Sequence, residues 1–183
     1  MKYEAKAWKE TEGACLRNFN EQAQIDSVNG ALALRPQIEK IIDQIWEEGF
    51  DGIYFIGIGG TYASSMQVEV YMRGRSKLPV FVENAAEFLT TGNKKFTNKS
   101  VVIISSVSGN TKEMVELVDR VHEKGAKVFS FIDNPGTILT QPDKQDYLIV
   151  YPMNEQLKFY MVANYLMIMT VIIKRWKLIL RMY

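Results

Sequence analysis

Cysteine and histidine are nearly absent from this sequence. Its 183 residues contain one cysteine, Cys15, and one histidine, His122. A single cysteine excludes an internal disulfide and a thiolate metal cluster, so the composition predicts a cytoplasmic chain with an inert thiol. A single histidine excludes a multi-histidine zinc site, and we expect His122 to be a surface residue. No metal and no other cofactor is expected.

An excess of charge of either sign is also missing. Lys and Arg number 22, Asp and Glu number 21, and the net charge is +1. Nucleic-acid-binding domains usually carry a basic excess, so no nucleic-acid partner is expected. The longest apolar stretch, Met161–Ile173, contains Asn164 and Thr170 and is shorter than the roughly 20 residues that span a bilayer. With no apolar segment near residue 1, the sequence predicts a soluble protein without signal peptide or membrane partner.

What is present is an alternation of short apolar runs and amphipathic patterns. The predicted strands are Ile53–Ile56, Pro79–Val82, Val101–Ile104, Ala126–Ile132 and Tyr147–Val150. The predicted helices are Pro36–Gly49, Tyr62–Met72, Asn110–Lys124 and Glu155–Ile173, with a turn region around 85–98 and a helical or irregular segment before residue 35. Such alternation predicts a parallel sheet covered by helices on both faces, a three-layer α/β/α domain. We expect the methionine-rich last helix to be buried in a subunit interface.

Glycines follow the first predicted strand, in the loop Gly57–Ser64 (GIGGTYAS). Glycine lets the backbone approach a ligand closely, and the free N–H groups of a following helix attract an anion. A dinucleotide site is conceivable because Glu83 follows the second strand, but Tyr62 stands where the fingerprint G-x-G-x-x-G needs its third glycine. A tight strand-to-helix turn explains this loop equally well.

Hydroxyl groups crowd the loop Ser105–Thr111 (SSVSGNT), which follows the third predicted strand. One such side chain would suffice as a helix cap, and Asn110 with Glu113 resembles a capping box. The surplus of donors favours a phosphate ligand at a helix N-terminus. Because neither loop contains a lysine, a monophosphate is favoured over a nucleoside triphosphate with magnesium.

Together, the two loops and the intervening segment Glu83–Phe88 (ENAAEF) resemble the sugar isomerase (SIS) domain, most closely that of the fructosamine 6-phosphate deglycases, which act on fructoselysine or glucoselysine 6-phosphate. The resemblance implies a five-stranded, flavodoxin-like parallel sheet. It also implies a phosphosugar site, whose residues would be Gly60, Thr61, Glu83, Ser106, Ser108, Gly109 and Thr111. Val107 stands where the family often has glutamine. Glu87 and Glu155 occupy positions that are often acidic near the sugar, but no catalytic residue can be transferred.

Two functions remain open on this resemblance. The first is a phosphosugar isomerase or deglycase acting on a fructosamine 6-phosphate or a related ketose or aldose phosphate. The alternative is a phosphosugar-binding module without catalysis, a truncated relative with one SIS domain that works through a partner. A dinucleotide-dependent oxidoreductase is disfavoured by Tyr62. We expect a homo-oligomer, a dimer or tetramer, in which 1–34 precede a single SIS domain (35–173) and 174–183 form a basic apolar tail.

Overall fold

The structure of the chain, a computed structural model, describes residues 21–152 and 156–181. Its strands are β1 (Gly52–Gly57), β2 (Val80–Asn84), β3 (Ser100–Ser106), β4 (Lys127–Ile132) and β5 (Tyr147–Val150). Its helices are α2 (Glu21–Ala33), α3 (Arg35–Glu48), α4 (Gly60–Arg73), α5 (Ala85–Thr91), α6 (Lys112–Glu123) and α7 (Gln156–Arg181), with 3-10 turns at Ile138–Thr140 and Pro142–Lys144. All five predicted strands and all four predicted helices are confirmed. Cys15 and Glu155 lie outside the described residues.

The strands form one parallel sheet in the order β2-β1-β3-β4-β5. This is the flavodoxin-like order, as expected. The chain leaves β1 toward one edge and β3 toward the other, so the order reverses between these two neighbouring strands. Ligands of such sheets bind outside the carboxyl ends of the strands at this reversal point.

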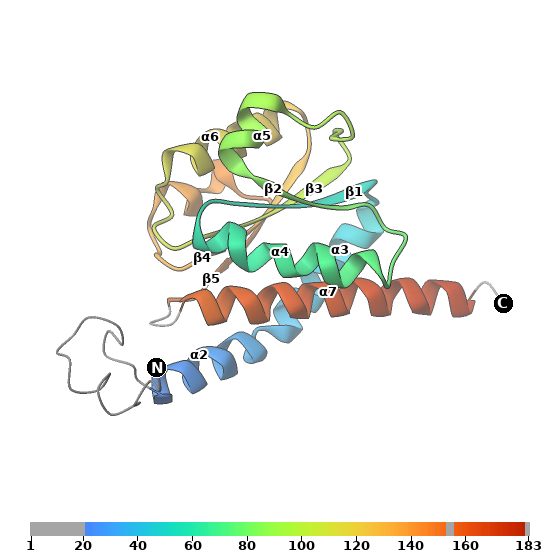
Figure 1. Ribbon diagram of the computed structural model, residues 1–183, viewed down its shortest axis with the longest axis horizontal. Helices are drawn as coiled ribbons and strands as arrows, with labels where there is room; N and C mark the ends of the chain where they lie inside the picture. The colour runs from blue at the N-terminus through green and yellow to red at the C-terminus, as the bar shows by residue number, and fades with distance from the viewer. Residues whose placement is uncertain (1–20, 153–155, 182–183) are drawn as a thin grey trace, which may run out of the picture.

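Alternate residues of each central strand enter two separate cores. Ile53 and Phe55 of β1 pack with α3, α4 and α7, whereas Tyr54 and Ile56 pack with α5 and α6. Figure 1 shows α5 and α6 above the sheet, and α3, α4 and α7 below it with α2 alongside α7. Because both faces are covered, β1 and β3 are buried along their whole length. The three-layer prediction is confirmed.

The segment 85–98, predicted as a turn region, begins with a helix. Asn84 starts α5 by accepting a hydrogen bond on its Oδ1 from the N–H of Ala86, at 3.0 Å. This N-cap signal was present in the sequence. The prediction missed it because a helix of 7 residues leaves almost no periodic pattern.

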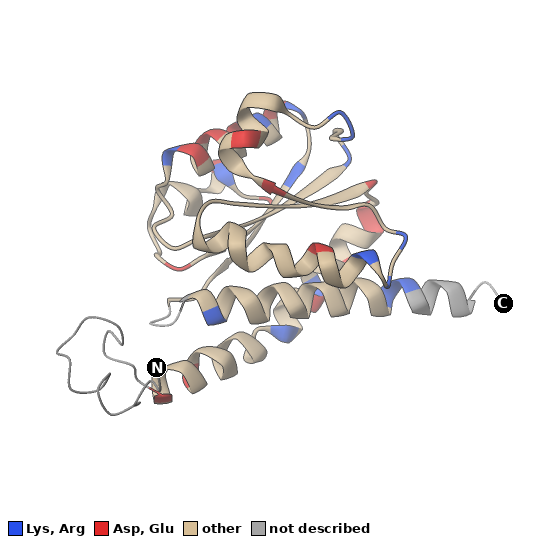
Figure 2. Ribbon diagram, in the orientation of Figure 1, with Lys and Arg blue, Asp and Glu red and all other residues tan. Residues whose placement is uncertain are grey.

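Helix α7 is longer than predicted and continues to Arg181. It buries one face against α2, α3 and α4, and the buried residues include Phe159, Tyr160 and Met167. Figure 2 shows few charged residues along it. The window Leu157–Arg175 is long and apolar enough to cross a membrane, and 44% of it is buried within the protein. One such helix is weak evidence for a membrane span, because core helices have the same composition.

His122 is partly buried and lies at the end of the sheet opposite the two loops. Its Nε2 lies 3.0 Å from Oδ2 of Asp146, and the same oxygen accepts the N–H of Val128 at 2.8 Å. The side chain of His122 is 28% exposed. These contacts join α6 to the start of β4, which is a structural role.

Candidate functional site

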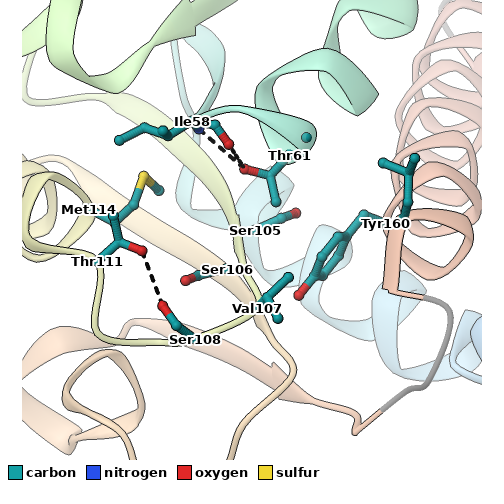
Figure 3. Close-up of a pocket in the computed structure, with 11 residues that line it drawn as sticks. Ile58, Thr61, Ser105, Ser106, Val107, Ser108, Thr111, Met114 and Tyr160 are labelled. Atoms are coloured by element: carbon teal, nitrogen blue, oxygen red, sulfur yellow. Dashed lines mark hydrogen bonds between the residues drawn. The ribbon is translucent and has the colours of Figure 1, made fainter. Parts of the chain in front are cut away.

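A cavity of about 360 Å³ opens at the reversal point, between the loops that follow β1 and β3. Helix α4 leaves β1 on one face of the sheet and α6 leaves β3 on the other, so the two loops diverge and leave this space. The lining residues are Ile58, Gly60, Thr61, Ser105, Ser106, Val107, Ser108, Thr111, Met114, Leu157 and Tyr160 (Figure 3).

Close backbone packing explains the glycines of the first loop. A Cβ on Gly57 would lie 2.7 Å from the nitrogen of Tyr62, so any side chain there would displace the start of α4. Thr61 then closes the loop, because its Oγ1 accepts from the N–H of Ile58 at 3.2 Å and donates to the C=O of Ile58 at 3.0 Å. The result is a turn that points the N-terminus of α4 at the cavity.

The second loop is shaped by Gly109. This residue has φ +66°, and a Cβ on it would lie 2.0 Å from Oγ1 of Thr137. The N–H of Gly109 donates to Oγ of the buried Ser106 at 3.0 Å. Ser108 and Thr111 turn their hydroxyl groups toward each other, with 3.1 Å between the two oxygens. The left-handed conformation of Gly109 and a buried hydrogen bond therefore fix where these hydroxyls lie.

The capping-box pattern of Asn110 with Glu113 does not cap α6 in the structure. The N-cap of α6 is Thr111, which makes no capping hydrogen bond through its side chain. Oδ1 of Asn110 instead accepts the N–H of Ile138 at 2.9 Å, which ties the loop to the segment after β4. The hydroxyl of Thr111 is thus not used as a cap and lies at the cavity.

Electrostatically, the cavity suits an anion without carrying a formal charge. The N-termini of α4 and α6 both adjoin it, and each presents free N–H groups and the positive end of a helix dipole. Among the described residues, no Asp, Glu, Lys, Arg or His side chain lines it. The site can bind an anionic oxygen group through neutral donors, and the described lining offers no carboxylate or imidazole for proton transfer.

The structure brings most of the predicted site residues together. Gly60, Thr61, Ser106, Ser108 and Thr111 all line the cavity. The other two predicted residues, Gly109 and Glu83, are not among the lining residues. Gly109 shapes the loop rather than lining the cavity.

Glu83 lies at the end of β2, beside Ile56 of β1, and is not among the lining residues. Its Oε1 accepts a hydrogen bond from Nδ2 of Asn93 at 2.7 Å. The carboxylate thus joins β2 to the segment that follows α5. Glu87, in the first turn of α5, is exposed.

Tyr160 is the main lining residue that sequence reasoning missed. It comes from α7, about fifty residues after the hydroxyl loop, and no local motif marks it. Its side chain is buried, and its Oη has no hydrogen-bond partner among the described residues. Burial raises the pKa of this phenol, and the nearby Asp133 carboxylate raises it further. The group therefore stays protonated at neutral pH.

With this geometry established, comparison with known proteins identifies the family. The SIS domain model matches residues 50–174. The chain belongs to the SIS domain family. A glutamine–fructose-6-phosphate aminotransferase [isomerizing] of Pyrococcus horikoshii is 23% identical over 116 residues, which are 63% of this chain and 19% of that protein. The SIS chain thus spans about a fifth of the length of the curated relatives that it matches.

Solved structures share the fold. Protein c3406 of Escherichia coli CFT073, solved in complex with A5P, gives a TM-score of 0.65 at 15% identity and covers 85% of this chain and 86% of its own. The NanR protein of Vibrio vulnificus, complexed with ManNAc-6P, gives 0.62 at 16% identity and covers 84% of this chain and 59% of its own. At these identities the likeness shows the fold alone.

Proposed function

We propose that this chain binds a phosphorylated monosaccharide in the cavity between β1 and β3. The observation that carries the proposal is the meeting of two helix N-termini and a cluster of hydroxyl groups in one cavity of about 360 Å³. This volume is in the range of small-molecule sites. The solved relatives with A5P and ManNAc-6P support the ligand class, since both ligands are sugar phosphates.

In this proposal, the phosphate lies at the hydroxyl loop. The hydroxyl groups of Ser108 and Thr111 donate hydrogen bonds to it, and Ser106 holds the loop through Gly109. Gly60 and Thr61 line the cavity at the start of α4, where the free N–H groups add donors. Thermal unfolding tests the proposal: fructose 6-phosphate should raise the melting temperature and fructose should not. Equal shifts from the two sugars would contradict it.

Isomerase or deglycase activity is a second candidate. Its support is the similarity to glutamine–fructose-6-phosphate aminotransferases, whose names carry the word "isomerizing". Since the described lining lacks an acidic or basic side chain, catalysis would need a general base from outside that lining. Direct assays of fructose 6-phosphate isomerization and of amine release from glucoselysine 6-phosphate decide between an enzyme and a binding module.

We also propose that the chain forms a homo-oligomer through α7. Exposed apolar side chains recur on α7 at every fourth residue, and we call them the α7 stripe: Leu157, Met161, Tyr165, Met169 and Ile173. A row of side chains four residues apart is the ridge that packs into the groove of another helix. Met66 and Val70 of the neighbouring α4 are also exposed, which enlarges the apolar surface. A second copy of this chain offers the same ridge.

The composition supports two further proposals, which concern nucleic-acid binding and cellular location. Nearly balanced charge argues against a nucleic-acid partner, and the scarcity of cysteine is consistent with a cytoplasmic location. We keep residues 35–173 as the proposed domain, since the family match covers 50–174.

A further inference from the structure

The phenol of Tyr160 is a buried polar group without a described partner, and it lies at the cavity. Tyr160 is 1% exposed, and its Oη makes no hydrogen bond with any described residue. A buried donor without an acceptor costs free energy, so such groups are rare unless a ligand or water completes them. Apolar side chains share the cavity wall with it, among them Ile58, Val107 and Leu157.

Position separates this phenol from the hydroxyl loop. Figure 3 shows Ser108 and Thr111 on one side of the cavity and Tyr160, from α7, on the other. A phosphosugar is an elongated molecule with its charge at one end. A ligand whose phosphate meets the hydroxyl loop therefore extends its uncharged oxygens across the cavity toward α7.

We propose that Tyr160 donates a hydrogen bond to a hydroxyl or carbonyl oxygen of the sugar and so distinguishes a phosphosugar from phosphate alone. This inference rests on the proposed function. The raised pKa of the phenol agrees with this role, because the phenol keeps its proton and can donate it in a hydrogen bond to a sugar oxygen. Tyr160 is thus a ligand-contacting residue supplied by a helix that lies outside both loops.

The experiment compares Tyr160→Phe with the wild type. Calorimetric titration with fructose 6-phosphate and with inorganic phosphate separates the two ends of the site. We expect the variant to bind fructose 6-phosphate about three- to tenfold more weakly and to bind phosphate as the wild type does. Tyr54→Phe is the matched control, because Tyr54 is also a buried tyrosine whose Oη has no partner among the described residues, and it does not line the cavity.

A second readout excludes a merely structural role. Since the hydroxyl of Tyr160 has no described partner, its removal should leave the melting temperature of the free protein unchanged or raise it by about 2 °C. A lower melting temperature would show that the hydroxyl has a partner in the fold and would overturn the inference. The inference would also be overturned if the variant bound fructose 6-phosphate as tightly as the wild type, or if its affinity for both ligands fell equally. A wild type that binds neither ligand would overturn the proposed function and the inference with it.

Discussion

The hydroxyl oxygens of Ser108 and Thr111 lie 3.1 Å apart, so the two groups form a hydrogen bond with each other at the N-terminus of α6. This mutual bond keeps two polar groups satisfied on a loop in which two other polar side chains serve the fold. Ser106 supports Gly109, and Asn110 supports Ile138. A phosphate can replace the mutual bond with two charge-assisted ones, which are stronger.

Removing the hydroxyls of Ser108 and Thr111 together should weaken ligand binding without changing the stability of the fold. In Ser108→Ala with Thr111→Val, neither hydroxyl is left alone, and the exposed N–H of Asn110, which donates to Oγ of Ser108 at 3.3 Å, can bond water instead. The melting temperature should therefore stay within about 2 °C of the wild type. Affinity for fructose 6-phosphate, measured by calorimetry, should fall about tenfold or more. Thr91→Val, an exposed threonine of α5, is the control and should bind normally. Unchanged affinity in the double variant would remove this loop from the site.

Two glycines with positive φ should differ in their tolerance of alanine. Gly59 (φ +56°) has nothing within 4 Å of the position of a Cβ, whereas on Gly109 a Cβ would collide with Thr137. Both substitutions should cost backbone strain of about 1–3 kcal/mol. Gly109→Ala should cost about 1–3 kcal/mol more than Gly59→Ala, because its Cβ also has to displace Thr137. Urea unfolding measures both. Equal losses would mean that the contact with Thr137 does not shape the loop.

Tyr54 should make stability depend on alkaline pH. Burial raises the pKa of its phenol to about 12, against 10 for an unperturbed tyrosine. Because the folded state holds this proton more tightly, the contribution to stability is complete below pH 10 and is lost as the pH rises toward 12. In Tyr54→Phe, the free energy of unfolding should fall less between pH 9 and pH 11 than in the wild type. Parallel pH profiles from urea unfolding would contradict this assignment.

The α7 stripe should control the oligomeric state. Met161→Glu introduces a charge into the proposed interface, so light scattering after size-exclusion chromatography should show a shift from oligomer to monomer. Ile138→Glu, the same kind of change at an exposed apolar residue outside α7, should leave the mass unchanged. A wild type that is monomeric at micromolar concentration would contradict the proposed oligomer.

The sheet and the hydroxyl loop could be predicted from sequence because their signals are local. Continuous apolar runs such as Val101–Ile104 indicate strands buried on both faces, and the loops at their carboxyl ends must share one edge of a parallel sheet. That geometric rule predicts that Thr61 and Ser108 lie close together, and both line the cavity.

Residues whose roles depend on distant partners could not be predicted. Asn110 has the spacing of a capping box, but its acceptor is used by Ile138, 28 residues later. Glu83 lies near the end of a strand, as a ligand-binding acid would, but its carboxylate accepts a hydrogen bond from Asn93. Tyr160 reaches the cavity only because α7 packs beside α4, and this packing leaves no mark in the sequence around it.

A crystal structure of the chain with fructose 6-phosphate tests the central claim most directly. The account predicts density for the phosphate within hydrogen-bond distance of the Ser108 and Thr111 hydroxyls, with the sugar extending toward Tyr160. Density for the phosphate at any other surface, with the cavity between β1 and β3 filled by solvent, would contradict it.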